Sequence, residues 1–191
     1  MRMYLPLALV LALFVQCRPA EAQEKNAVGL TLAYPASVGL LWPVSITCAL
    51  RPEISGSLRS NDSTVTSGTG QVSSGGSSDN RALGGGLSVL FYVRKWEDLR
   101  VYVTPRFAYT RSTSTSDTSD YVASDYLVSG SVGFEYSLGR RFGIFAEIGV
   151  SYDRQTSSNN VAGTGVTAGS VLDTTISTTG PRSGIGAIFR F

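Results

Sequence analysis

Apolar and polar residues alternate with a period of two along most of this chain. In residues 142–153, apolar side chains occupy every even position, and Gly, Ser and acidic residues occupy most odd positions. This period is typical of a β-strand with one apolar face. It recurs in eight segments, which are residues 27–34, 37–42, 45–58, 83–94, 100–110, 125–138, 142–153 and 183–191. Because no segment sustains the three-four apolar spacing of a helix, the pattern predicts an all-β protein.

Most of these segments are long enough to cross a bilayer as tilted strands, which requires about 9–11 residues each. The segment 37–42 is the weakest, and it could be the end of one long first strand that continues past Pro35. Short and long connections alternate along the chain, and an even number of strands leaves both ends on the same side. We therefore expect a hairpin at residues 34–37 and an eight-stranded antiparallel up-and-down transmembrane β-barrel.

The connections between the predicted strands fall into two classes. One class is short, at residues 43–44, 95–99 and 139–141, whereas the other comprises residues 59–81, 111–124 and 155–182, which are rich in Ser, Thr, Gly and Asn. Transmembrane barrels have short turns on the periplasmic side and longer loops outside the cell. The sequence thus predicts three mobile external loops (59–81, 111–124 and 155–182), through which an extracellular ligand could bind.

The polar face of the predicted strands favours a membrane barrel over a water-soluble one. A soluble periplasmic barrel shows the same alternation, but its polar face meets water and suits long charged side chains. Here that face consists mainly of Gly, Ser, Ala and Thr, and the mature chain has Lys only at Lys25 and Lys95, outside the strands. Small side chains suit the narrow interior of an eight-stranded barrel, which holds only its own side chains or one small ligand.

A few charged residues also lie on the face that we expect to point inward. They are Arg51, Glu53, Arg106, Glu135 and Glu147. An unpaired charge in such an interior is costly, so the sequence predicts an ion-pair network across the lumen. Eight strands enclose too little space for both these charges and a column of water, which argues against an open channel.

Aromatic residues near the strand ends form two predicted belts. Trp42, Phe91, Tyr136, Phe142, Phe189 and Phe191 lie toward the short turns, and Tyr34, Tyr109, Tyr126 and Tyr152 lie toward the long connections. Aromatic belts are expected where side chains sit at the two lipid–water boundaries.

The N-terminal segment has the features of a secretory signal peptide. Arg2 precedes an apolar run from Tyr4 to Val15, which is too short to span a membrane, and small residues follow at Ala20 and Ala22. We predict a signal peptide over residues 1–22 and one barrel domain over residues 23–191. Cys17 raises the alternative of a lipoprotein signal, but Gln16 stands where such signals have a small residue.

Composition excludes several functions for the mature chain. Removal of residues 1–22 lowers the formal net charge from +2 to +1, so no nucleic-acid partner is indicated. Cys48 is then the sole cysteine, and the sequence contains no histidine. These counts exclude an intrachain disulfide, a thiolate cluster, a His-ligated metal and a Ser-His or Cys-His nucleophile. We predict no enzyme activity, no cofactor and no metal site.

The alternating strands and the last segment, 184–191 (GIGAIFRF), resemble the bacterial outer-membrane β-barrel family that includes the OmpA membrane domain, OmpX-like proteins and small porin-like barrels. The resemblance implies a location in the outer membrane of the cell envelope, in contact with its lipid. It also implies assembly by periplasmic chaperones and the barrel-assembly machinery, with Phe189 and Phe191 in the assembly signal. The expected function is a structural or surface-interaction role with a lumen filled by side chains. The alternative is a small porin-like transport protein for ions or apolar solutes.

Overall fold

A computed structural model of the chain describes residues 28–34, 37–62, 65–66, 72–73, 77–116, 119–161 and 170–191. The predicted signal peptide, residues 1–22, lies outside these ranges. The described residues contain no helix that is long and apolar enough to cross a membrane.

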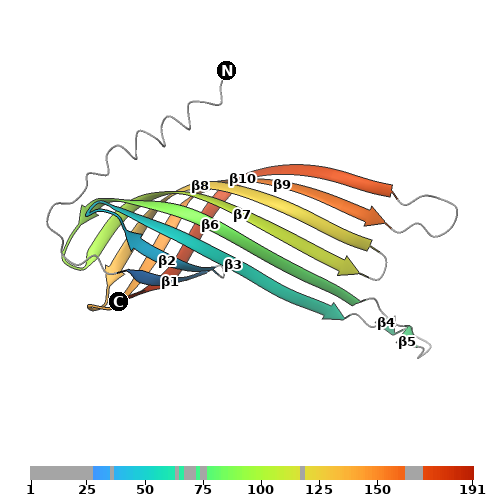
Figure 1. The fold of residues 1–191 in the computed structure, drawn as a ribbon, viewed down its shortest axis with the longest axis horizontal. Coiled ribbons are helices and arrows are strands. Elements are labelled where there is room, and N and C mark those ends of the chain that lie inside the picture. The colour runs from blue at the N-terminus through green and yellow to red at the C-terminus, as the bar shows by residue number, and fades with distance from the viewer. Residues whose placement is uncertain are drawn as a thin grey trace, which may run out of the picture.

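Eight antiparallel strands form a closed barrel (Figure 1). They are β1 (Gly29–Tyr34), β2 (Ser37–Pro43), β3 (Cys48–Asp62), β6 (Ser77–Lys95), β7 (Leu99–Ser116), β8 (Ser119–Ser137), β9 (Phe142–Val161) and β10 (Ser170–Arg190). Each strand pairs with its neighbours in the chain, and β1 closes the ring by pairing with β10. A separate two-stranded ribbon, β4 (Val65–Thr66) with β5 (Val72–Ser73), lies between β3 and β6 in the sequence.

The predicted number of strands and their up-and-down order are confirmed. The weakest segment forms β2, which pairs with β1 from Ser37 opposite Ala33 to Leu41 opposite Gly29. Tyr34 and Ser37 therefore flank a hairpin, as the parity of the connections predicts. The short connections after β2, β6 and β8 gather at one end of the barrel, which we call the turn end.

At the opposite end, β3 and β6 to β10 run past the ends of β1 and β2 as a curved sheet, which we call the extension (Figure 1). The prediction of long structureless loops is wrong for much of residues 59–81, 111–124 and 155–182. For example, β7 and β8 remain paired from Thr110 opposite Asp125 out to Ser116 opposite Ser119. Each further residue pair extends a hydrogen-bonded ladder that begins in the closed barrel, and Ser and Thr residues are compatible with a strand. Low hydrophobicity alone therefore did not prevent strand formation here.

The two faces of the barrel differ as the alternation predicts. Along β9, Ile148 and Val150 are exposed on the outside, whereas Phe145 and Glu147 are buried in the interior. The hydrophobic core lies inside the barrel and consists of Leu41, Ala49, Leu90, Tyr102, Phe145 and Ile188. The barrel thus exposes its apolar residues to the outside and fills its interior.

Aromatic side chains mark both edges of the apolar outer surface. Toward the turn end, the rings of Phe142 and Phe189 lie 5.1 Å apart, and toward the extension the rings of Tyr109 and Tyr126 lie 5.0 Å apart. Trp42 is 57% exposed, so its indole is available to the surrounding medium. This arrangement matches the two predicted belts, and the belt with Tyr109, Tyr126 and Tyr152 separates the apolar surface from the extension.

Two glycines of β8 provide a test of the filled interior. A Cβ at Gly133 would overlap the ring of Tyr102, which is 1% exposed, whereas a Cβ at Gly130 would meet no atom within 4 Å. We expect Gly133→Ala to lower the thermal stability of the folded barrel, because the buried ring of Tyr102 would have to move away from its hydrogen bond to Glu147.

Gly130→Ala, on the outer face of the same strand, is the matched control and should leave that stability unchanged. Both variants are compared by the temperature at which the folded band disappears on a gel without prior boiling. Equal temperatures would contradict the close contact between Gly133 and Tyr102.

Candidate functional site in the barrel lumen

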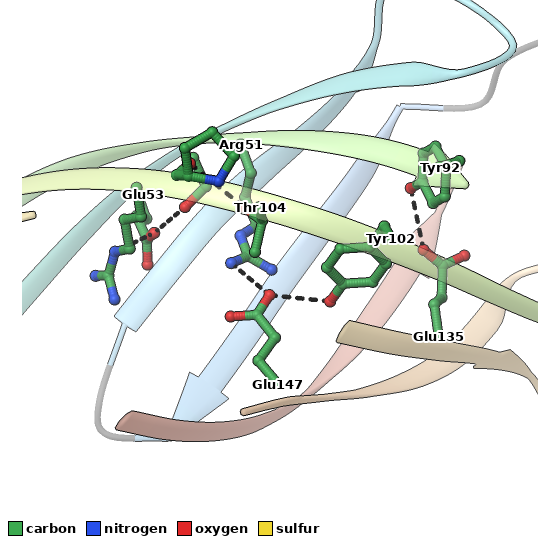
Figure 2. A network of polar contacts seen from close by, with 10 residues as sticks. Arg51, Glu53, Tyr92, Tyr102, Thr104, Glu135 and Glu147 are labelled. Carbon is green, nitrogen blue, oxygen red and sulfur yellow. Dashed lines mark hydrogen bonds and ion pairs between the residues drawn. The ribbon is translucent and has the colours of Figure 1, made fainter. Parts of the chain in front are cut away.

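Three buried carboxylates organise the polar side chains of the lumen (Figure 2). Glu147 of β9 lies across the barrel from Arg51 of β3, and Oε1 of Glu147 is 2.8 Å from Nη2 of Arg51. The hydroxyl of Tyr102, from β7, donates a 2.9 Å hydrogen bond to the same oxygen. The Arg51 guanidinium also lies 5.1 Å from the centre of the Phe145 ring. Three strands that are not sequence neighbours are thereby joined through one carboxylate.

The second carboxylate, Glu53, lies two residues beyond Arg51 on β3. Its Oε1 is 2.8 Å from Nε of Arg106 on β7, and Ser88 of β6 donates a 2.9 Å hydrogen bond to that oxygen. Ser88 is completely buried. Because inward positions repeat every second residue, Arg51 and Glu53 carry opposite charges side by side and face opposite charges on other strands.

The third carboxylate, Glu135 of β8, lies nearest the turn end and is completely buried. Arg190 of β10 forms an ion pair with it, and Nη1 of Arg100 on β7 is 3.7 Å from its Oε1. The hydroxyl of Tyr92 donates a 3.2 Å hydrogen bond to Oε2 (Figure 2). Arg190 thus connects the last strand of the barrel to the middle of the chain.

This arrangement is suited to holding the interior together. Each of the three buried carboxylates has an arginine within ion-pair distance and accepts a hydrogen bond from one hydroxyl group. Within the described ranges, no group of three or more His, Cys, Asp and Glu residues is placed to hold a metal ion. Paired charges of this kind restrict the registers in which strands can assemble, since a shifted strand would leave a charge buried and unpaired.

The sequence placed Arg51, Glu53, Arg106, Glu135 and Glu147 inside the barrel, and the structure brings each of them into an ion pair there. It does not form one continuous five-residue network, because Glu135 pairs with Arg190 and Arg100. Sequence reasoning missed these two arginines, together with the hydroxyls of Tyr92, Tyr102 and Ser88. Strand parity was the available signal for Arg190, Tyr92 and Tyr102, since all three stand at positions that face inward.

Two further carboxylates, Asp125 and Asp153, lie on the inner face beyond the belt of Tyr126 and Tyr152, where the extension begins. Each has one buried carboxylate oxygen without a hydrogen-bond partner, and Ser151 donates a 3.5 Å hydrogen bond to Asp153. Burial, and then the negative charge of Asp153, raises the pKa of Asp125 above its ordinary value. Unlike the three carboxylates deeper in the lumen, this pair places like charges near each other.

Comparison with known proteins yields a structural likeness only. No family model matches the chain, and no curated protein matches it. Among solved structures, a major outer membrane protein from Thermus thermophilus aligns over 86% of this chain and 98% of its own, with 11% identity and a TM-score of 0.51. This likeness shows that the chain has the fold of an outer-membrane β-barrel.

Two proteins of Acinetobacter baumannii are also similar. CarO aligns over 90% of this chain and 100% of its own, with 13% identity and a TM-score of 0.42. CarO2 aligns over 86% of this chain and 97% of its own, with 12% identity and a TM-score of 0.38.

The Glu147 ion pair provides a test of the lumen contacts. We expect Glu147→Ala to lower the free energy of unfolding by about 3–5 kcal/mol, because it leaves Arg51 buried without a partner. Urea unfolding of the lipid- or detergent-bound barrel measures the change. The control is Asp79→Ala, which removes an exposed carboxylate on the extension. The double variant Arg51→Met/Glu147→Leu replaces both charged partners and should recover most of the lost free energy of unfolding. Equal free energies of unfolding for Glu147→Ala and Asp79→Ala would refute a stabilising role for the Glu147 ion pair.

Asp125 provides a pH-dependent prediction. Since its pKa is raised in the folded state, ionisation of this carboxyl group opposes folding at neutral pH. We expect Asp125→Asn to raise the melting temperature at pH 7. The gain should shrink as the pH falls through the raised pKa and should vanish below the ordinary range of Asp, where the carboxyl group is protonated in both states. Melting temperatures of the unmodified protein and of Asp125→Asn between about pH 3 and 8 measure this gain, and Asp79→Asn is the control. A gain in melting temperature that does not depend on pH would contradict the prediction.

Proposed function

We propose that this protein is an integral outer-membrane β-barrel with a structural or surface-interaction role, that its lumen is closed to solutes, and that it performs no catalysis. The outward apolar surface between two aromatic belts supports a membrane location, because hydrocarbon can surround such a surface and every strand in the closed part of the ring is paired. The fold shared with the Thermus outer membrane protein supports the same location.

The filled lumen is the observation that carries the closed-barrel proposal. Inward side chains of five strands are almost free of solvent contact, with exposed fractions of 3% for Leu41, 1% for Leu90, 1% for Tyr102, 4% for Phe145 and 2% for Ile188. The ion pairs of Glu53 and Glu147 lie in the same interior. A porin-like pathway would require water to pass these groups, and an eight-stranded barrel has little room for it.

The extension supports the surface-interaction role. Six strands continue beyond the belt of Tyr109, Tyr126 and Tyr152, and they carry mainly Ser, Thr, Asn and Asp. In an outer-membrane orientation this polar sheet projects outside the cell, since the short connections lie on the periplasmic side. A sheet presents a more defined surface to a partner than mobile loops do. The ligand-binding segments are accordingly proposed within residues 59–81, 111–124 and 155–182.

The resemblance to the OmpA membrane domain and OmpX-like proteins extends this proposal to assembly. Phe189 packs against Phe142 on the outside of the barrel, and Phe191 is 80% exposed. Phe189 is the penultimate residue of β10, and Phe191 follows the strand directly. We include in the proposal that these two residues belong to the signal read by periplasmic chaperones and the barrel-assembly machinery.

Two measurements test the proposed function together. We expect the protein to fractionate with outer membranes and to migrate differently on gels with and without boiling, as folded membrane barrels do. In planar lipid bilayers we expect no steady unit conductance, because the lumen is filled. Reproducible unit steps would refute the closed lumen and favour the porin-like alternative, whereas recovery in the soluble periplasmic fraction would refute the membrane location.

A further inference from the structure

A groove on the outer surface of the barrel combines an apolar floor with two arginines at its edge toward the extension. It runs over β3, β6 and β7 with a volume of about 1030 Å³, a size typical of ligand pockets. Ile54, Leu58 and Leu83 contribute its exposed apolar side chains, with exposed fractions of 66%, 83% and 74%. We call it the β3–β7 groove.

Two glycines make the groove hollow. Gly56 and Gly85 point outward from neighbouring strands, and a Cβ at either position would meet only ordinary van der Waals contacts. The backbone therefore does not require glycine at these positions for lack of space. Their missing side chains leave a depression between Ile54 and Leu83 that a flexible apolar chain can enter.

The register of the strands sets the heights of the polar groups around this depression. Gly85 pairs with Tyr109, Leu83 with Arg111, and Arg81 with Thr113, in successive rows toward the extension. Arg111 thus lies two residues beyond Tyr109 of the aromatic belt, and Arg81 lies one row beyond Arg111. Two residues of a tilted strand rise about 5 Å, which is the thickness of the polar headgroup layer. On this scale the backbone of Arg111 lies about 5 Å beyond Tyr109, level with the headgroups, and that of Arg81 about 10 Å beyond it, so that the long Arg81 side chain must extend back toward the groove to reach a headgroup.

Arg81 and Arg111 have no carboxylate partner among the residues that the structure describes. Both side chains are exposed. Asp79 is the nearest acidic residue on the same face of β6, one outward position beyond Arg81, on the side away from the apolar floor. Two unpaired guanidinium groups above an apolar groove are complementary to a phosphate that is attached to acyl chains.

We propose that the β3–β7 groove binds one membrane lipid with a phosphate headgroup. Arg81 and Arg111 donate hydrogen bonds to the phosphate, and an acyl chain lies over Gly85 and Gly56 against Ile54 and Leu83. A neighbouring groove, lined partly by Leu32 and Val38, shares Ile54, Gly56 and Leu83 with the first, so the apolar floor continues toward the β1–β2 hairpin. The proposal rests on the membrane location proposed above.

The test measures binding of dioleoyl phosphatidic acid to the full barrel, purified in a neutral detergent, by native mass spectrometry. We expect Arg81→Gln and Arg111→Gln each to weaken binding about tenfold, the effect of losing one charge-assisted hydrogen-bonded contact. Gly85→Leu fills the depression and should also weaken binding about tenfold, by displacing methylene groups of the acyl chain.

Matched controls separate the groove from general effects. Arg154→Gln removes another outward arginine at a similar height on β9, outside the groove, and Gly130→Leu adds the same apolar bulk to open surface on β8. Both should bind the lipid as the unmodified protein does. Each variant is first shown to give the heat-modifiable folded band, so that a defect in the barrel is distinguished from a defect in the groove.

Two further ligands identify what is recognised. Dioleoylglycerol, which has the same chains without phosphate, should bind at least about tenfold more weakly than the phosphatidic acid. Millimolar inorganic phosphate should not displace the bound lipid. The proposal would be overturned if dioleoylglycerol bound as tightly as the phosphatidic acid, or if inorganic phosphate alone displaced the lipid. It would also be overturned if Arg154→Gln weakened binding as much as the groove variants do, or if Gly85→Leu bound the lipid fully. None of these outcomes would affect the membrane location, which fractionation and the folded band test separately.

Discussion

Closure of the sheet by pairing of β1 with β10 is the constraint on which the rest of this structure depends. Once the ring is closed, alternate side chains of every strand must enter a narrow interior, and the others must face outward. An unpaired charge in that interior would be costly, so each inward carboxylate in the closed part of the barrel that the structure describes has a cationic partner. The ion pairs of Glu53, Glu135 and Glu147 are consequences of closure, and they also favour it, because each spans strands that are distant in the sequence.

The size of the interior explains which residues accompany these charges. Tyr102 of β7 reaches Glu147 of β9 over β8, because Gly133 leaves room there for its ring. Ser88 donates a hydrogen bond to Glu53, which also pairs with Arg106. In both places a small inward residue gives space to a large one, and the side chains involved are almost completely buried. The same packing accounts for the proposed closed lumen, since the groups that stabilise the ring occupy the space that a solute would need.

In the proposed membrane location, the outer surface follows a different requirement, because it meets hydrocarbon at mid-height and water beyond the aromatic belts. Ile148 and Val150 are suited to hydrocarbon, and the belt with Tyr109, Tyr126 and Tyr152 is suited to the lipid–water boundary. Arg111 and Arg81 lie beyond that belt, toward the extension. A barrel in such a medium needs no internal partner for these arginines. Beyond them, the extension continues as a polar sheet that is formed by the same ladders as the closed barrel.

The sequence by itself determined the number of strands, their order and the face of most strand residues, because strand parity is local and a period of two is visible in every segment. A β-bulge between Tyr92 and Arg94 pairs Arg94 with the outward Val101, although the alternation assigns it to the polar face. It also placed Arg51, Glu53, Arg106, Glu135 and Glu147 inside. Only the tertiary structure decided which of these residues meet, since partners such as Arg190 and Glu135 depend on the register of strands far apart in the chain. It also decided that Ser- and Thr-rich segments such as 111–116 continue as strands, because an existing ladder supplies the hydrogen bonds that their composition alone does not predict.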